Sequence, residues 1–275
     1  EQRLRDYVAA HWPSMVTIGL AEGASTDRLR FTTSLEEAVR DADFVQENGP
    51  EDLGFKRELF RQLDELAPAD VVIATSSSTI IISELQTACA LHPERVVLGH
   101  PFNPPHLIPL VEVAGGSATS EQAIEGALDF YRAMDKHPIR LRKEVLGHVA
   151  NRLQAALWQE AFHLVESGVA SVADIDAAIA HGPGVRWALL GLFLNLHLSG
   201  GEAGLGGLLN KPLWKATESM WRDLGRVSVG PELAAKVTAG VDAVLADHPA
   251  QALVAQRDAA LLALLRSKAQ ATELS

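Results

Sequence analysis

Hydrophobic positions follow different patterns in the two halves of the chain. Before about Arg142, amphipathic helical stretches alternate with short apolar runs rich in valine and isoleucine. This alternation is typical of a parallel sheet covered by helices. The runs predict strands at residues 44–49, 71–78, 96–100, 110–116 and 138–142. The runs VVIATSSS and VVLGH have near-continuous apolar bodies, as strands buried on both faces do.

From Val145 onward the pattern is helical. One amphipathic stretch extends to Glu166, and a capping box at Ser171 and Asp174 opens a further helix. We therefore predict an α/β domain with a parallel sheet over residues 1–143, followed by an all-helical domain over residues 144–275.

Charge and composition narrow the range of partners. The 275 residues carry 24 basic and 35 acidic side chains, a formal charge of −11, and such a surface repels nucleic acid and anionic lipid. The longest apolar stretch, residues 187–198, is interrupted by Asn195 and His197 and is too short to cross a membrane. The single cysteine, Cys89, cannot form an intrachain disulfide. We expect a cytoplasmic protein with no nucleic-acid, membrane or metal partner.

Polar side chains stand where the predicted strands end. Ser76, Ser77 and Ser78 close one apolar run and His100 closes the next. Ligands of open α/β sheets bind outside the carboxyl ends of the strands, so these residues are candidates for a site. The structural alternatives are serine caps on the following helix and a histidine that shapes the turn before Pro101.

Glu112 interrupts LIPLVEV, a run that otherwise has the pattern of a buried strand. A buried carboxylate is costly unless it is paired, and the nearest candidate partner is His100, joined to it by the short loop PFNPPHLIP. A histidine held in one tautomer by a carboxylate is a usual general base near neutral pH. The alternative is a purely structural ion pair.

Three segments together resemble the 3-hydroxyacyl-CoA dehydrogenase superfamily: SLEEAVRDADFVQENGPEDLGFKRELFRQLDELAPADVVIATSSST, HPERVVLGHPFNPPHLIPLVEVAGG and LGHVANRL. The resemblance implies a Rossmann-like domain that binds NAD, a helical domain that forms a homodimer, and oxidation of a hydroxyl group. It implies that His100 is the general acid/base and Glu112 its orienting carboxylate. Ser78 and Asn151 would hydrogen-bond to the substrate oxygen.

The same resemblance suggests residues for the cofactor. Glu51 and Lys56, in PEDLGFK, would lie on the nicotinamide-ribose side, together with Ser76 and Asn103. Ser76 stands where many relatives have asparagine. The alternatives are a solvated helix N-terminus for Glu51 and Lys56 and a turn-forming role for Asn103.

The front of the chain departs from the family pattern. No G-x-G-x-x-G occurs, and residues 1–20 have the pattern of a helix that in relatives follows the second strand. We expect the α/β domain to be incomplete at its N-terminus by about forty to fifty residues, the size of a strand-helix-strand unit.

Residues 182–204, GPGVRWALLGLFLNLHLSGGEAG, resemble members that oxidise free hydroxy acids rather than acyl-CoA. Trp187, Phe193 and the GGEAG segment resemble the members that act on carnitine more than those that act on L-gulonate, and aromatic faces suit a quaternary ammonium. Arg186 is a candidate for the substrate carboxylate. The alternatives are helical packing for the two aromatic residues and a surface position for Arg186. The function alternatives are L-gulonate or acyl-CoA oxidation, a crystallin-like structural role, and carnitine binding without turnover.

Overall fold

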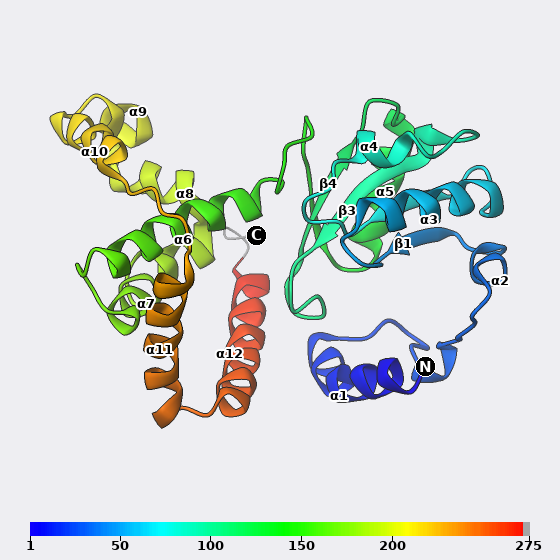
Figure 1. Cartoon of the computed structure of the whole chain (residues 1–275), viewed down its shortest axis with the longest axis horizontal. Coiled ribbons are helices and arrows are strands. Elements are labelled where there is room, and N and C mark those ends of the chain that lie inside the picture. The colour runs from blue at the N-terminus through cyan, green and yellow to red at the C-terminus, as the bar shows by residue number, and fades with distance from the viewer. Residues whose placement is uncertain (272–275) are drawn as a thin grey trace. The chain divides into compact units, whose positions relative to one another are not determined.

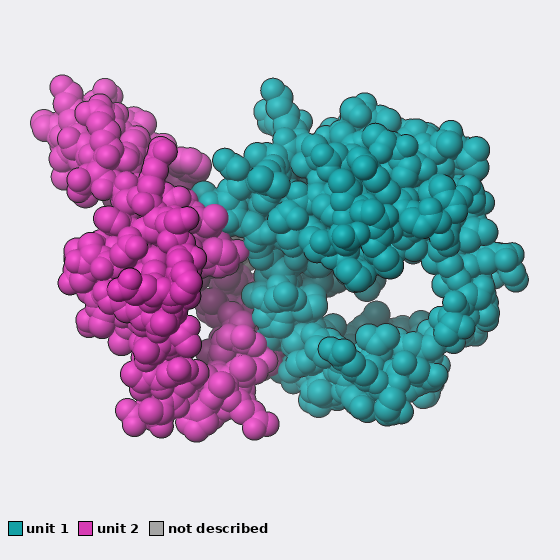
Figure 2. Space-filling model, in the orientation of Figure 1, with its two compact units in different colours: residues 1–153 teal, residues 154–275 magenta. Residues whose placement is uncertain are grey.

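The computed structural model describes residues 1–271. The chain divides into two compact units between residues 153 and 154 (Figure 2). The division falls inside a helix, beyond the predicted boundary near Lys143. The first turn of that helix belongs to the first unit because its backbone amides hydrogen-bond to the sheet residue Glu112.

The first unit contains a five-stranded sheet in the order β1-β2-β3-β4-β5. Figure 1 labels β1, β3 and β4 of this sheet. All five predicted strands are present. β1, β2 and β3 are parallel, and β5 is parallel to β4, but β3 and β4 are antiparallel. The predicted parallel sheet is therefore mixed, because residues 102–109 return directly as a hairpin loop and make this one pair antiparallel. The strand bounds are Phe44–Glu47, Val72–Thr75, Val96–Pro101, Leu110–Gly115 and His137–Arg140.

Several helices in the first unit begin at polar caps. Ser34, Asp52 and Ser120 each accept a hydrogen bond from a backbone N–H in the first turn of the helix that follows, which supplies an acceptor to an otherwise unpaired donor. The helix predicted at the start of the chain is present. The helices are α1 (Gln2–Ile18), η1 (Thr26–Arg28), α2 (Leu35–Val39), α3 (Leu53–Leu66), α4 (Ile82–Gln86), η2 (Pro93–Arg95) and α5 (Glu121–Ala133).

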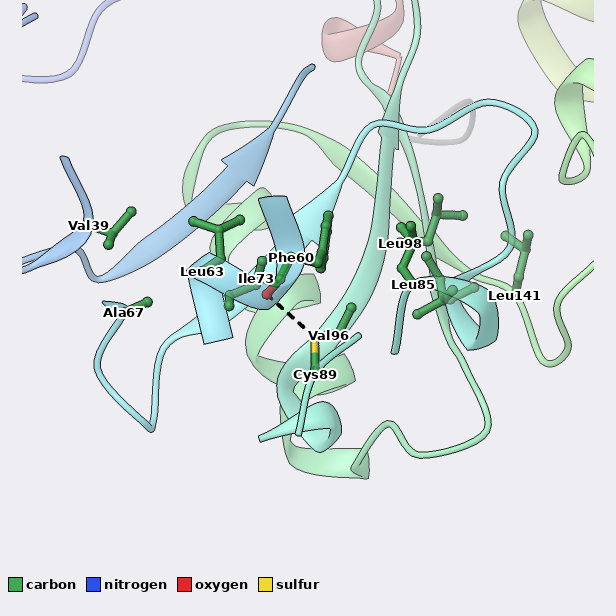
Figure 3. Packing of buried hydrophobic residues seen from close by; sticks show 12 residues of the cluster. Val39, Phe60, Leu63, Ala67, Ile73, Leu85, Cys89, Val96, Leu98 and Leu141 are labelled. Atoms are coloured by element: carbon green, nitrogen blue, oxygen red, sulfur yellow. Dashed lines mark hydrogen bonds between the residues drawn. The ribbon is translucent and has the colours of Figure 1, made fainter. Parts of the chain in front are cut away.

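Apolar side chains from the sheet form a core on each of its faces. On one face, strand residues such as Leu98 pack with α3 and α4, and on the other, residues such as Val97 pack with α5. Figure 3 shows the first cluster, in which the Cys89 thiol points at the Phe60 carbonyl, 3.7 Å away. Burial raises the pKa of this thiol to about 12. Cys89 is therefore a core residue and is poorly suited to act as a nucleophile.

The second unit is helical, as predicted. Ser171 and Asp174 form the expected capping box. The long helix α8 is broken at Gly191, whose φ of 71° suits glycine. Of the apolar side chains described in this unit, only those of Val165 and Leu233 are buried. Its helices are α6 (Ala150–Glu166, starting in the first unit), α7 (Val172–Ala180), α8 (Pro183–Ser199), η3 (Gly201–Ala203), α9 (Gly204–Leu209), α10 (Pro212–Asp223), α11 (Pro231–Asp247) and α12 (Ala250–Gln270).

The length and hydropathy of the helices bear on membrane crossing. In residues 1–271 no single helix is long and apolar enough to cross a bilayer. The pair α7 and α8 meets the criterion only when taken together, across a bend of 54°.

Candidate active site

His100 and Glu112 face each other across the β3–β4 hairpin. They are register partners in the antiparallel pair, and His100 Nδ1 lies 3.1 Å from Glu112 Oε2. Both side chains are buried, with 4% and 0% of the residue exposed. The structure thus brings together the two residues that the sequence paired on grounds of burial.

The N-terminus of α6 holds the Glu112 carboxylate from the other side. Its Oε1 accepts hydrogen bonds from the backbone N–H groups of Val149, at 2.8 Å, and Ala150, at 2.9 Å. Burial favours the protonated acid. The hydrogen bonds from His100, Ala150 and Val149 outweigh this effect and hold the pKa of Glu112 below its usual value. Glu112 is therefore an anion at neutral pH, and the positive end of the helix dipole stabilises it further.

This carboxylate selects the tautomer of His100. A carboxylate can only accept, so the proton is on Nδ1 and the lone pair is on Nε2. Nε2 lies 3.1 Å from the Ser78 hydroxyl. The edge of the His100 ring packs against the Phe102 ring, with centroids 4.9 Å apart. His100 can therefore accept a hydroxyl proton at Nε2 while Glu112 stabilises the resulting imidazolium.

Glu51 organises the serine loop that follows β2. Its carboxylate accepts from Ser77 Oγ at 2.7 Å and from both the backbone N–H and Oγ1 of Thr79 at 2.8 Å. Partial burial opposes ionisation, but these hydrogen bonds and the Lys56 charge lower the pKa of Glu51. Glu51 is thus a charged residue that fixes the segment carrying Ser78. Its predicted contact with the cofactor stays a prediction.

Lys56 is not the solvated side chain considered as an alternative. It is 1% exposed, and its Nζ lies 2.7 and 2.8 Å from the two oxygens of Glu47. Glu47 also accepts from Thr75 Oγ1 at 2.6 Å, and Lys56 donates to the Gly49 carbonyl at 3.2 Å. This buried ion pair ties α3 to the ends of β1 and β2, directly beside Glu51.

Ser76 belongs to a hydrogen-bond network that sequence reasoning missed. Gln46 Nε2 donates to Ser76 Oγ at 2.8 Å and to the Gly99 carbonyl at 3.0 Å, and Tyr131 donates to Gln46 Oε1. Ser76 Oγ in turn donates to Asn48 Oδ1 at 2.7 Å. The network fixes the carboxyl ends of β1, β2 and β3 relative to one another.

Two further predicted residues come from the loop after His100 and from the helix that binds Glu112. Asn103 is exposed in the loop between β3 and β4 and precedes a cis peptide bond to Pro104. Asn151 is half-buried in the first turn of α6, directly after the amide of Ala150 that binds Glu112. Asn151 therefore comes from the backbone segment that binds the carboxylate.

The three predicted substrate residues meet in the second unit. Arg186, Trp187 and Phe193 lie on α8, on either side of the break at Gly191, and line one open depression of about 240 Å³. Phe193 is 74% exposed, so helical packing alone does not account for its position. The other lining residues are Leu192, Asn195, Leu196 and Ser199.

The strand ends of the first unit are where a nicotinamide dinucleotide would bind. Asn48, Glu51, Ser76 and Ser78 place polar groups at the carboxyl ends of β1 and β2, where such cofactors bind in open α/β sheets, and they fit the nicotinamide-ribose end. Residues 1–271 contain no glycine-rich strand-to-helix turn of the kind that cradles a pyrophosphate. The described residues therefore fit the nicotinamide-ribose end of the cofactor and not its pyrophosphate.

Comparison with known families agrees with this arrangement. The model of the 3-hydroxyacyl-CoA dehydrogenase NAD binding domain matches residues 3–145, and that of the 3-hydroxyacyl-CoA dehydrogenase C-terminal domain matches residues 147–225. The chain belongs to the 3-hydroxyacyl-CoA dehydrogenase family. It is an NAD-dependent oxidoreductase that acts on CH–OH groups, which confirms the predicted class, fold and cofactor.

Individual proteins that the chain resembles define its relatives more narrowly than the family models do. The chain is 48% identical to L-carnitine dehydrogenase of Streptomyces coelicolor over 97% of this chain and 83% of that protein. It is 43% identical to L-carnitine dehydrogenase of Pseudomonas putida, with the same coverage. Among solved structures it is similar to 5-formyl-3-hydroxy-2-methylpyridine 4-carboxylic acid 5-dehydrogenase, an NAD⁺-dependent dismutase, with a TM-score of 0.78 and 30% identity, covering 96% of this chain and 86% of that one.

Proposed function

We propose that the protein oxidises the 3-hydroxyl of L-carnitine to 3-dehydrocarnitine. The observation that carries the reaction is the buried His100–Glu112 pair, in which Nε2 of the imidazole is left to accept a proton. The choice of substrate rests on relatives named L-carnitine dehydrogenase, which are 42–48% identical over most of the chain.

The proposed steps assign one task to each residue. The substrate hydroxyl donates its proton to His100 Nε2 while the C–H bond of the carbon that bears it breaks and its electron pair leaves as hydride, and the Glu112 carboxylate stabilises the imidazolium that forms. Ser78 and Asn151 hydrogen-bond to the substrate oxygen and hold it in line with the base. Bound NAD supplies the hydride acceptor. The products are a ketone, NADH and a proton that leaves through His100.

The depression on α8 supports a zwitterionic substrate. Carnitine carries a trimethylammonium group, which cannot donate a hydrogen bond, and a carboxylate. Aromatic faces such as those of Trp187 and Phe193 attract the first group, and the Arg186 guanidinium matches the second. A lone cation would be repelled by Arg186. The combination therefore favours a substrate that bears both charges.

We also propose that the enzyme is a homodimer formed through the helical unit and that it acts in the cytoplasm. Support for the dimer comes from large apolar side chains that this unit exposes, well beyond isolated surface residues. They include Trp158 at 55%, Leu213 at 67% and Trp221 at 56%. The segments around Trp158 and Leu189 are the proposed contact regions.

The test measures NADH formation by the purified protein with L-carnitine, L-gulonate and a 3-hydroxyacyl-CoA. We expect turnover of L-carnitine and a loss of about 100- to 10,000-fold in His100→Ala. Trp187→Leu should raise KM for carnitine more than for an uncharged 3-hydroxy acid, whereas Trp12→Leu, on α1 and outside the depression, should change neither. Turnover of L-gulonate with no activity on carnitine would replace the proposed substrate. Near-normal turnover in His100→Ala would refute the assigned base.

A further inference from the structure

His148 is a buried ionisable residue that the proposed reaction leaves without a task. It is 3% exposed and lies in the loop just before α6. Its φ of 54° follows a φ of 75° at Gly147, so two successive residues are left-handed. A residue other than glycine rarely adopts this conformation unless its surroundings impose it. The contacts of His148 therefore need an explanation.

The side chain reaches the serine loop. His148 Nε2 lies 2.9 Å from the carbonyl oxygen of Ser77. A carbonyl can only accept, so this nitrogen carries the proton. Ser77 is followed by Ser78, whose hydroxyl lies 3.1 Å from Nε2 of His100. The hydrogen bond thus fixes the peptide unit that presents Ser78 to the base.

The backbone of the same residue serves the other partner of His100. The left-handed turn at His148 is followed by the N–H groups of Val149 and Ala150, which donate to one oxygen of Glu112 at 2.8 and 2.9 Å. One residue therefore connects the serine on one side of the His100 ring with the carboxylate on the other side.

The charge state of His148 also matters, because its ring centroid lies 5.1 Å from that of His100. The titratable groups around it are His100, Glu112 and Glu51. Burial, helped by the charge of His100, lowers the pKa of His148 and outweighs the opposing effects of the Ser77 hydrogen bond and the two carboxylates. His148 is therefore neutral at neutral pH. A proton taken up by His100 does not meet a second positive charge.

We propose that His148 is a positioning residue for the oxidation, holding Ser78 and Glu112 at their hydrogen-bonding distances from His100 through its side chain and its backbone. The proposal rests on the proposed function only in taking His100 as the base. It concerns neither the identity of the substrate nor direct contact with it.

The test compares His148→Phe, which keeps a ring but removes the donor, with His148→Asn, which tolerates a left-handed φ and retains an N–H donor. We expect His148→Phe to lower kcat about 10- to 100-fold, the scale of a small misplacement of reacting groups, with KM for NAD changed less than about threefold. The acidic limb of its pH–rate profile should also shift. His148→Asn should recover part of kcat. His137→Phe, at an exposed histidine of β5, is the matched control.

The outcomes separate this inference from the proposed function. If His100→Ala is inactive while His148→Phe keeps the wild-type kcat and pH profile, the positioning role is wrong and the base assignment stands. If His100→Ala stays active, the base assignment itself fails. Should His148→Phe not fold, ¹⁵N NMR of the imidazoles in the wild-type protein decides, with His148→Asn identifying the signal. A protected proton on Nε2 of His148 supports the proposal, and a proton on Nδ1 instead overturns it.

Discussion

Glu112→Gln tests whether the buried carboxylate selects the tautomer of the base. The glutamine has nearly the same shape, so its oxygen can continue to accept from the N–H groups of Val149 and Ala150. Its amide N–H₂ then faces Nδ1 of His100, which is itself a donor. Two donors cannot share a hydrogen bond. The imidazole must move its proton to Nε2, where it blocks the lone pair that accepts the substrate proton.

The expected loss of activity is therefore close to loss of the base. A general base contributes about 100- to 10,000-fold, which corresponds to about 3 to 5 kcal/mol of activation free energy. The change in folding stability should be much smaller. Glu112 loses charge-assisted hydrogen bonds worth about 1.5 to 3 kcal/mol each, but the neutral amide no longer opposes complete burial. We expect a net loss of about 1 kcal/mol of unfolding free energy, a few degrees in Tm.

The assay measures kcat for NADH formation across pH together with Tm from thermal unfolding. Glu125→Gln, at an exposed position on α5, is the control for removal of one negative charge. A fall in kcat of at least about 100-fold with a shifted pH–rate profile is expected. A Glu112→Gln enzyme with kcat within about threefold of wild type and an unchanged pH–rate profile would refute the tautomer argument, because a blocked base should lower kcat at least about 100-fold.

Two further predictions concern stability and assembly. Lys56→Met leaves Glu47 as an unpaired buried charge and should lower the unfolding free energy by about 3 to 5 kcal/mol, measured by chemical denaturation. Lys143→Met, at an exposed position, is the control. Adding Glu47→Gln to Lys56→Met should restore most of the lost stability, and purely additive effects of the two substitutions would contradict the pairing. The purified protein should have the mass of a dimer by light scattering at micromolar concentration; a monomer there would show that the exposed side chains around Trp158 do not form a subunit interface.

The strand positions were predictable because a run of hydrophobic residues indicates a strand that is buried on both faces of a sheet. The same run occurs whether the strand is parallel or antiparallel to its neighbour. The antiparallel β3–β4 pair was missed for the same reason. The connecting loop sets the direction of β4 relative to β3, and the apolar residues of the two strands do not indicate that direction. Glu112 could be found because a carboxylate inside an apolar run violates the pattern. The sequence therefore singled out Glu112, and His100, the nearest suitable residue in sequence, proved to be its hydrogen-bond partner.

Contacts between polar residues far apart in sequence were missed. Tyr131 and Gln46 are separated by 85 positions, and neither interrupts an apolar pattern strongly enough to demand a partner. Lys56 did leave a signal, since it falls on the same helical face as Leu53 and Phe60 and should therefore point inward. His148 left none, because its left-handed backbone is found only in the folded structure.

The register of the β3–β4 hairpin determines which residue stands opposite His100. His100 pairs with Glu112 on one face, while Val97, Val111 and Val113 fill the core under α5 on the other. A slip of one residue would set His100 opposite Val111 or Val113 and move a whole strand's side chains to the wrong face. Burial of these valines makes such a slip costly. The hydrophobic core beneath α5 therefore fixes which strand residues stand opposite each other, and within that register the proposed role of His148 is to hold Ser78 and Glu112 at their hydrogen-bonding distances from His100.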